Sequence, residues 1–276
     1  MSDTRVLPLE GVHNFRDFGG YAVAGGGRLK RGLLWRSGQH NGASDDDLSQ
    51  IASLGLADVF DLRSSKERET HPCRRPQDFA ARIFLSDDPV HSPALRIGAA
   101  PDDDKKHAAP HIAGAAGPHK RSAEETREGM RRNYGHIAFR PELIAMIRSQ
   151  LAVLAEARGP SLVNCMAGKD RTGIAVAMIQ FAAGVHRDDI IADYVLTNSA
   201  GDVEARIRAG AETIRAMSRG LDEEVVRVVM GVEPEYLESA FAAITEKHGS
   251  LDGYLSAVLG VDDALRGKLA EVLVDT

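Results

Sequence analysis

Cysteine is scarce in this sequence. The 276 residues hold only two cysteines, Cys73 and Cys165, which excludes a framework of disulfide bonds as the basis of the fold. The ten histidines are scattered, and no group of cysteines and histidines has the spacing of zinc ligands. We therefore expect neither a metal site nor another cofactor.

Long apolar runs are also missing. The first ten residues lack the apolar segment of a signal peptide, and the longest uncharged apolar stretch, 172–186, is shorter than the ~18–20 residues that a membrane span needs. The sequence therefore predicts a soluble protein with no stable membrane insertion. We expect a cytoplasmic location by default, with secretion by a route that needs no signal peptide as the alternative.

Positive charge is not in excess. Lys and Arg number 34 against 40 Asp and Glu, a formal net charge of −6, which argues against a surface devoted to nucleic acid. Hydrophobic residues make up 43% of the chain, enough for a core, so disorder throughout is excluded. The length allows one large domain or two small ones. We predict a single domain over 1–276, and nothing in the sequence indicates its oligomeric state.

Strands and helices alternate along most of the chain. Glycine-rich turns within 12–37 indicate short strands, with Tyr21–Val23 and Leu33–Trp35 as a hairpin. Apolar periodicity predicts the elements that follow: a helix after Ser44, a strand over Ala57–Leu62, a helix from Pro141, a strand over Ser161–Val163 and a helix over 172–184. From 188 to 276 we expect only helices, in pieces over 189–196, 202–217, 235–248, 251–259 and 262–273. This order predicts an α/β fold, with a mostly parallel sheet flanked by helices and a helical C-terminal part.

One stretch fits no regular element. Residues 86–122 are rich in Ala, Pro, Gly, Asp and His and have little apolar periodicity, which is typical of a flexible insertion. We expect such an insertion over 86–135, and a lid is the more specific hypothesis. Its end carries a cationic helix face formed by Arg127, Arg131 and Arg132. We predict a solvated surface there, whereas a lid helix would favour anionic lipid headgroups or acidic phosphopeptides.

One loop combines a nucleophile with anion-binding groups. Between the strand at 161–163 and the helix at 172 lie Cys165 and, six residues later, Arg171. Backbone N–H groups and a helix N-terminus can bind a tetrahedral anion there, and a guanidinium can hold two phosphate oxygens. Gly168 permits a close approach of backbone to ligand. A cysteine in an anion site suits covalent phosphoryl transfer.

The loop resembles the signature of the Cys-x5-Arg phosphatases. Cys165–Gly173 is similar to the Cys-x-x-Gly-Lys-Asp-Arg-Thr loop of bacterial atypical phosphatases, the mycobacterial tyrosine phosphatase B group. Further segments match that group in its order: Asn14–Tyr21, Gly32–Ser37 and Asp61–Ser64 before the loop, and His248–Leu255 after it. The resemblance implies a three-layer Cys-based phosphatase fold. It also implies metal-independent hydrolysis of phosphate monoesters through a phosphocysteine intermediate.

The resemblance also implies roles for residues of the loop. Cys165 would attack phosphorus, Arg171 would bind the phosphoryl oxygens, and Thr172 would help the thiolate leave. The phosphate would be bound by Met166, Ala167, Gly168, Lys169, Asp170 and Arg171. In this family the Lys-Asp pair is associated with broad substrates, namely phosphotyrosine, phosphoserine or phosphothreonine, and phosphoinositides. We therefore expect a phosphorylated protein or a phosphoinositide as the partner.

The general acid that protonates the leaving group is not settled by the sequence. Asp61, in the family's Asp-Leu-Arg-Ser element, is the first candidate and Asp170 the second. More remote candidates lie in the insertion: Asp87, Asp88 and Asp102 to Asp104. The alternative for Asp61 is a structural role as the partner of an arginine. We expect an ion-pair network near the site from Arg16, Asp17, Arg36 and Arg63, with substrate binding by Arg63 as a further hypothesis.

Asn164 departs from the pattern of the resemblance. In most Cys-x5-Arg enzymes a histidine precedes the cysteine, and asparagine cannot supply the positive charge of an imidazolium. We therefore expect a less stabilised thiolate and lower turnover, and the alternative is a phosphate-binding pseudophosphatase. Sulfur or arsenate chemistry would also use a cysteine in an anion loop. Arsenate reductases generally need resolving cysteines, however, and only Cys73 is available. A redox pair of Cys73 with Cys165 is a minor hypothesis.

Overall fold

A five-stranded sheet lies at the centre of the molecule in the computed structural model, which describes residues 5–86, 122–208, 211 and 222–275. In spatial order its strands are β1 (Arg16–Asp17), β3 (Leu34–Ser37), β6 (Ser161–Asn164), β4 (Asp58–Asp61) and β5 (Arg82–Leu85). The last four pair in parallel, and β1 pairs antiparallel with β3. The prediction of a mostly parallel sheet is confirmed.

Apolar side chains leave both faces of this sheet. Phe60 and Val163 enter the larger core, whereas their neighbours Val59 and Leu162 enter a smaller one on the opposite face. Successive residues of a strand point to opposite sides, so strands buried on both faces read as short, continuous apolar runs. Two packed faces make this a three-layer α/β fold.

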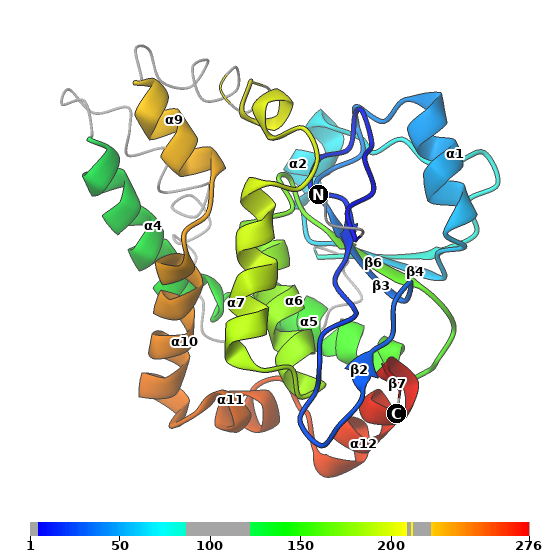
Figure 1. Cartoon of the computed structure of the whole chain (residues 1–276), viewed down its shortest axis with the longest axis vertical. Helices are drawn as coiled ribbons and strands as arrows, with labels where there is room; N and C mark the ends of the chain where they lie inside the picture. The colour runs from blue at the N-terminus through cyan, green and yellow to red at the C-terminus, as the bar shows by residue number, and fades with distance from the viewer. Residues whose placement is uncertain (1–4, 87–121, 209–210, 212–221, 276) are drawn as a thin grey trace.

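The smaller core is covered by the N-terminal segment and by helix α1 (Asp45–Ser53). Ser44 caps α1 by accepting from the Asp47 N–H, while the Asp47 carboxylate accepts from the Ser44 N–H, the reciprocal pattern of a capping box. A second capping box, Ser64 with Glu67, begins helix α2 (Ser65–Thr70). Figure 1 shows α1 and α2 on one side of the strands.

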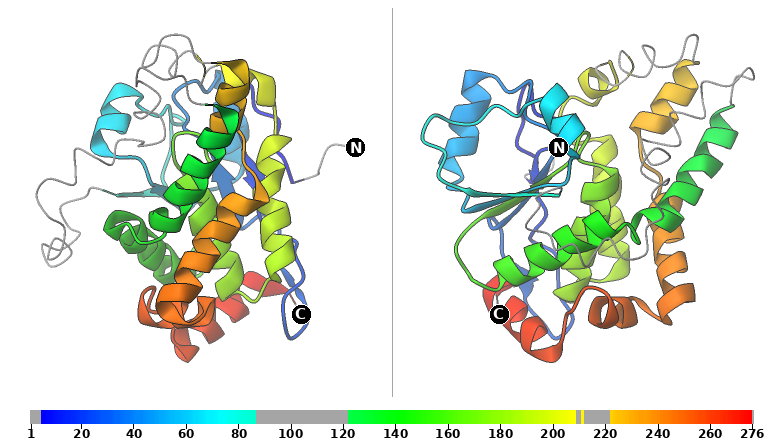
Figure 2. Two further views of the ribbon diagram at one scale, coloured as in Figure 1. Left: turned by 90° about the vertical axis from the view of Figure 1, so that its left-hand side faces the viewer. Right: turned by 180° about the vertical axis from the view of Figure 1, so that it is seen from behind.

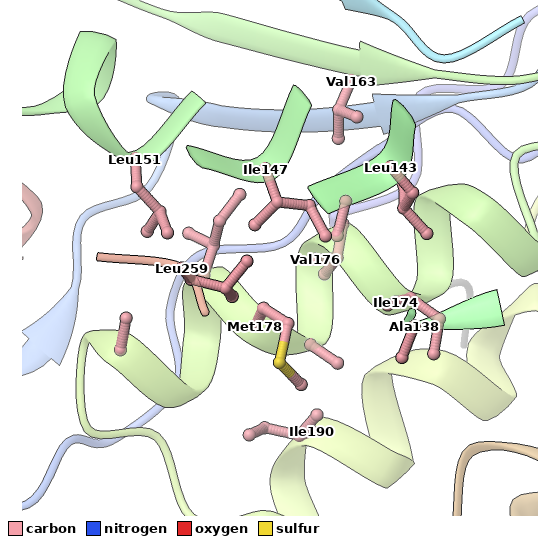
Figure 3. Packing of buried hydrophobic residues seen from close by; sticks show 14 of the residues in the cluster. Ala138, Leu143, Ile147, Leu151, Val163, Ile174, Val176, Met178, Ile190 and Leu259 are labelled. Atoms are coloured by element: carbon pink, nitrogen blue, oxygen red, sulfur yellow. The ribbon is translucent and has the colours of Figure 1, made fainter. Parts of the chain in front are cut away.

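Most helices cover the other face. They are α4 (Ala123–Ile137), α5 (Pro141–Leu154), α6 (Asp170–Ala182), α7 (Arg187–Val195), α10 (Pro234–His248), α11 (Leu251–Ala257) and α12 (Asp263–Leu273). Figure 3 shows side chains from β6, α5, α6 and α7 meeting in this core. Helix α6 is buried on nearly all sides, as expected for a helix that is apolar all round.

Helices α4, α10 and α9 (Glu223–Met230) pack together beside the main body, and the views of Figures 1 and 2 agree on this placement. A short 3-10 helix (Leu196–Asn198) follows α7, and 203–208 are helical. Of the insertion expected over 86–135, residues 87–121 lie outside the described residues, and 123–135 belong to α4. Within the described ranges no helix combines the length and apolarity of a membrane span.

Two details of the sequence prediction were wrong. Tyr21–Val23 does not form a hairpin with Leu33–Trp35, because β1 takes that place beside β3. Near Tyr21, only isolated bridges form, such as Ala22 with Arg28. The C-terminal part is also not purely helical: strand β7 (Val274–Asp275) pairs antiparallel with β2 (Arg28–Leu29). Strands of two residues carry too little periodicity for a sequence to reveal their partners.

Candidate active site

The anion loop lies between β6 and α6, at the carboxyl end of the central strand. Cys165 directly follows β6 and is 3% exposed, and Asp170 begins α6. The partial positive charge of a helix N-terminus therefore points at the loop. The loop and the start of α6 hold the predicted residues together: Cys165, Met166, Ala167, Gly168, Lys169, Asp170, Arg171 and Thr172.

Gly168 allows the loop to turn against strand β3. Its φ is +66°, and a Cβ at this position would lie 2.4 Å from the carbonyl carbon of Ser37. No other residue fits this space and this backbone conformation without strain. The carbonyl oxygen of Gly168 accepts from Asn14 Nδ2 (2.7 Å) and Arg36 Nη2 (2.9 Å), which fixes the direction of the following peptide.

These contacts orient the N–H groups of the loop. The C=O and N–H of a trans peptide point in opposite directions. Because Asn14 and Arg36 hold the Gly168 carbonyl, the Lys169 N–H points away from them. The Met166 carbonyl accepts from the Gln39 N–H at 3.0 Å. The Ala167 N–H, which belongs to the same peptide, therefore points away from Gln39. Within the described ranges the N–H groups of 166–169 meet no protein acceptor, and they are available to an anion.

A buried cluster supports this arrangement from behind. Asp193 on α7 accepts from Arg36 Nη1 (2.9 Å) and from Arg16 Nη2 (3.4 Å), and all three side chains are fully buried. Burial opposes the charge of Asp193, but the two guanidinium groups outweigh it and hold the pKa of Asp193 below its ordinary value. Burial and the charge of Arg36 lower the pKa of Arg16 to about 10.

The expected ion-pair network contains Arg16 and Arg36, with Asp193 in the place expected for Asp17. Asp17 does not pair with Arg16 or Arg36. Its carboxylate accepts from the N–H groups of Gly19 and Gly32, both at 2.7 Å, and pairs with Arg31 at 3.2 Å. The alternation of side chains along β1 explains the difference, because successive residues of a strand face opposite sides.

Arg171 is held by a carboxylate that the sequence analysis did not single out. Its Nη1 and Nη2 each donate to Glu67 at 2.7 Å, and Nη1 also donates to the Leu62 carbonyl at 3.0 Å. Burial opposes the charge of Arg171, but Glu67 and then the sulfur of Cys165 outweigh it and raise the pKa of Arg171 above its ordinary value. The guanidinium is therefore charged and fixed in direction.

Two buried side-chain oxygens at the loop have no hydrogen-bond partner among the described residues. Thr172 Oγ1 and Asn164 Oδ1 make no hydrogen bond within the described part of the chain. Buried polar atoms are normally paired, so such atoms at a reactive loop are candidates for contact with a ligand or water. Asn164 Nδ2 does have a partner, since it donates to Asp61 Oδ1 at 3.2 Å.

The contacts of Asp61 favour the structural alternative for this residue. Its carboxylate accepts from Arg63 Nε (2.9 Å) and Arg63 Nη2 (2.7 Å), and the side chains are 2% and 1% exposed. Arg63 Nη1 donates to the His71 carbonyl at 2.6 Å and to Gln39 Oε1 at 3.3 Å. Every guanidinium nitrogen of Arg63 is thus engaged by the protein itself, which favours a structural role over substrate binding.

Asp170 keeps more contact with solvent. Its side chain is 20% exposed, and Oδ1 accepts from Lys169 Nζ (2.9 Å) and from the hydroxyl of Tyr134 on α4 (2.7 Å). Tyr194 on α7 donates in turn to the Tyr134 hydroxyl at 2.6 Å. This chain of hydrogen bonds fixes the carboxyl group of Asp170 relative to the loop.

The remaining candidates from the sequence are the more remote acids and Cys73. Asp87, Asp88 and Asp102 to Asp104 lie outside the described residues. Cys73 and Cys165 are free thiols, and Cys73 Sγ accepts from the His40 N–H at 3.2 Å. The described residues contain no group of three His, Cys, Asp or Glu side chains that could hold a metal ion.

The cationic face of α4 is not an isolated patch of positive charge. Arg127 pairs with Glu233 at 2.8 Å, and Arg131 pairs with Glu124 at 2.7 Å. Arg132 lies 3.5 Å from Glu128. Because glutamates accompany all three arginines, this surface offers little net charge to an anionic lipid or peptide.

Sequence reasoning missed three residues that support the loop: Glu67, Tyr134 and Asp193. Glu67 carried a local signal, since Ser64-x-x-Glu67 is a capping box. Its second role, as the carboxylate that accepts from Arg171, depends on the fold and has no signal in the local sequence. Tyr134 and Asp193 lie on distant helices and carry no local signal of their own.

Comparisons with known proteins match this chain over most of its length. A family model described as "Tyrosine phosphatase family" matches residues 7–275. The chain is 32% identical over 293 residues to the triple specificity protein phosphatase PtpB of Mycobacterium tuberculosis, covering 98% of this chain and 99% of that protein. It is 33% identical over 266 residues to "Putative tyrosine-protein phosphatase" of Cupriavidus necator, covering 95% and 87%.

Proposed function

Because the chain belongs to the tyrosine phosphatase family and is a phosphatase, we propose that it hydrolyses phosphate monoesters with Cys165 as the nucleophile. The observation that carries this proposal is the loop from Cys165 to Arg171. The N–H groups that meet no protein acceptor among the described residues, the N-terminus of α6 and the charged Arg171 all belong to the segment that carries Cys165. These are the groups that stabilise a phosphoryl group in transfer.

The reaction has two steps. The Cys165 thiolate attacks phosphorus, an S–P bond forms, and the P–O bond to the leaving group breaks. The leaving oxygen takes a proton from a general acid. Water then gives a proton to the deprotonated general acid and attacks the phosphocysteine; a P–O bond forms and the S–P bond breaks, which releases inorganic phosphate and the thiolate. Arg171 and the loop N–H groups bind the phosphoryl oxygens in both steps. The Thr172 hydroxyl, which has no partner within the described residues, stabilises the departing thiolate.

We assign the general acid to Asp170 rather than Asp61. Asp170 lies in the loop itself, is partly exposed, and is held in one direction by Tyr134 and Lys169. Asp61 is committed to Arg63 and Asn164 and has almost no exposed surface. An acid must reach the leaving oxygen, and this requirement favours Asp170.

The proposed substrates are phosphotyrosine first, with phosphoserine, phosphothreonine and phosphoinositides in addition. The name of the mycobacterial relative, a triple specificity protein phosphatase, supports a broad range. Lys169 belongs to the loop and carries a positive charge, and its ammonium pairs with Asp170 at 2.9 Å. Broad specificity follows if most of the binding energy comes from the phosphate and little from the rest of the substrate.

The proposal is tested by metal-free turnover of para-nitrophenyl phosphate, a phosphotyrosine peptide and phosphoinositides. Cys165→Ser should lower kcat by at least about a thousandfold, because a hydroxyl is a far weaker nucleophile than a thiolate. Asn164→His should raise turnover and shift the pH profile, because an imidazolium adds positive charge next to the nucleophile. Wild-type activity that survives in Cys165→Ser would contradict the mechanism.

The acid is tested separately, by leaving-group dependence. Asp170→Asn should reduce turnover of phosphotyrosine peptide about ten- to a hundredfold more than that of para-nitrophenyl phosphate, whose leaving group needs little protonation. Asp61→Asn should lower the melting temperature and affect both substrates alike. The opposite pattern would return the acid role to Asp61.

A further inference from the structure

One buried arginine near the loop has no counterion among the described residues. Four arginines of the described residues are fully buried: Arg16, Arg36, Arg63 and Arg206. The first three pair with carboxylates of the protein: Arg16 and Arg36 with Asp193, and Arg63 with Asp61. Arg206, in the helical segment 203–208, is 2% exposed and forms no ion pair within the described part of the chain. A buried guanidinium without an anion is costly.

The contacts of Arg206 leave most of its donors free. Its Nη1 donates to the Thr197 carbonyl at 2.6 Å, whereas Nε and Nη2 have no hydrogen-bond partner in the part of the chain that the structure describes. These two nitrogens lie on one edge of the guanidinium, and an edge with two parallel N–H groups is suited to bind two oxygens of one phosphate. The side chain is thus anchored at one nitrogen and unpaired along one edge.

The position of Arg206 is beside the catalytic loop. The hydroxyl of Thr197, whose carbonyl anchors Arg206, lies 3.5 Å from Asn14 Nδ2, and this nitrogen also donates to the Gly168 carbonyl. Burial lowers the pKa of Arg206 to about 10, and the charge that opposes this is that of Asp170. Burial and the charge of Arg206 also lower the pKa of His13. Arg206 therefore lies within electrostatic reach of the loop.

We propose that Arg206 forms a second phosphate subsite, which binds a further phosphate group of the substrate while the first occupies the Cys165 loop. This inference rests on the proposed function and extends it to preferred substrates. A second phosphate would provide the missing counterion and would satisfy Nε and Nη2. Because Thr197 and Asn14 connect Arg206 to the Gly168 carbonyl of the loop, the subsite fits a compact substrate with two phosphates close together, rather than a second phosphate far along an extended chain.

The test compares phenyl phosphate with the 1,2-, 1,3- and 1,4-benzene bisphosphates. In the wild type at least one bisphosphate should exceed phenyl phosphate about tenfold or more in kcat/KM, the effect of one charge-assisted contact. In Arg206→Gln this ratio should fall to about two, the statistical value for two equivalent esters. Arg227→Gln is the matched control, because Arg227 is exposed and pairs with Glu204 and Glu223, and it should keep the wild-type ratio.

Free phosphate is the other source of the same ligand chemistry. If inorganic phosphate fills the subsite, it should inhibit the wild-type turnover of phenyl phosphate by competition at the Cys165 loop and should also act at a second site. In Arg206→Gln only the competitive inhibition should remain. Arg206→Lys, which keeps the charge but loses the paired N–H groups, should give an intermediate ratio and serves if Arg206→Gln fails to fold. Equal ratios in wild type and in every folded Arg206 variant, with purely competitive phosphate, would overturn the proposal. Loss of the proposed function itself would instead abolish turnover of phenyl phosphate in the wild type.

Discussion

Glu67 and Arg171 form the most consequential pair of residues at the site. The carboxylate holds both terminal nitrogens of the guanidinium at 2.7 Å, and a bidentate contact of this kind restricts the direction of the guanidinium plane. Burial opposes the charge of Glu67, but Arg171 outweighs it and holds the pKa of Glu67 below its ordinary value of 4.5. The geometry of Arg171 and the pH response of the protein are therefore linked.

Glu67→Gln should lower kcat/KM about ten- to a hundredfold, because Arg171 loses a charged partner and its fixed direction. It should also destabilise the protein by about 1–3 kcal/mol at neutral pH. A carboxyl group whose pKa is lower in the folded protein stabilises it above the unfolded value and loses this effect as the pH falls. The stability difference between wild type and variant should therefore close below pH 4.5.

Urea unfolding across pH measures this difference. The matched control is Glu69→Gln, an exposed glutamate of the same helix, which should leave both kcat/KM and stability nearly unchanged. A gap between wild type and Glu67→Gln that stays constant from neutral pH to well below 4.5 would show that Glu67 does not act through its charge.

At this scale the sequence reveals the reactive residues better than their supports. The spacing of Cys165, Gly168 and Arg171 lies within one short loop, so the loop could be recognised. The partners that orient the loop come from distant segments, and nothing in the sequence near Asp193 marks it as the counterion of Arg16 and Arg36. Long-range pairing depends on the packing of elements and not on local pattern.

The hydroxyl of Tyr134 joins helix α4 to the loop. Tyr134 is fully buried and donates to Asp170, and Tyr194 on α7 donates to Tyr134. Burial and the negative charge of Asp170 raise the pKa of Tyr134 well above its ordinary value, so the hydroxyl remains a donor over the working pH range. The orientation of Asp170, the proposed general acid, therefore depends on the position of α4.

Tyr134→Phe should lower kcat about three- to tenfold on phosphotyrosine peptide, because Asp170 loses one of the donors that orient it, and should cost about 1–2 kcal/mol of stability. Tyr194→Phe is the informative comparison, since it removes a similar buried hydroxyl and leaves the bond from Tyr134 to Asp170 in place. It should lower stability with little change in kcat. Equal kcat values for the two variants would mean that Tyr134 is only structural.

Elements with strong periodicity were predicted well, and short ones poorly. The helices α1, α5 and α10 have long amphipathic or capped sequences, and their positions follow from pattern. Helix α9 was not predicted; it follows the segment 212–221, which lies outside the described residues. Strands β1 and β2, of two residues each, take their partners from tertiary contacts rather than from propensity.

The C-terminal end of the described chain is paired with strand β2. Strand β7 pairs with β2, and the Lys30 N–H donates to the Leu273 carbonyl at 2.7 Å. Ending the chain at Leu273 removes β7 and should destabilise the protein by about 1–3 kcal/mol, the value of a few hydrogen bonds and their packing. KM should stay unchanged, because β7 lies away from the loop.

Urea unfolding of this truncation, beside a chain that lacks only Thr276, measures the contribution of β7. A truncated protein as stable as the control would mean that the pairing with β2 adds nothing to stability.

At the scale of the whole molecule, the class of fold followed from the order of elements. The spatial order of the strands did not, because β6 lies between β3 and β4 although it begins 100 residues after the end of β4.

The central place of β6 has a consequence for biosynthesis. When Asp61 leaves the ribosome, β3 and β4 are complete, but the strand that separates them ends only at Asn164. At about 5–20 residues per second, the 103 intervening residues take roughly 5–20 s to be made. Throughout that interval both strands present open edges to other nascent chains. Production of this phosphatase should therefore respond to translation speed and to chaperone supply more than its final stability suggests.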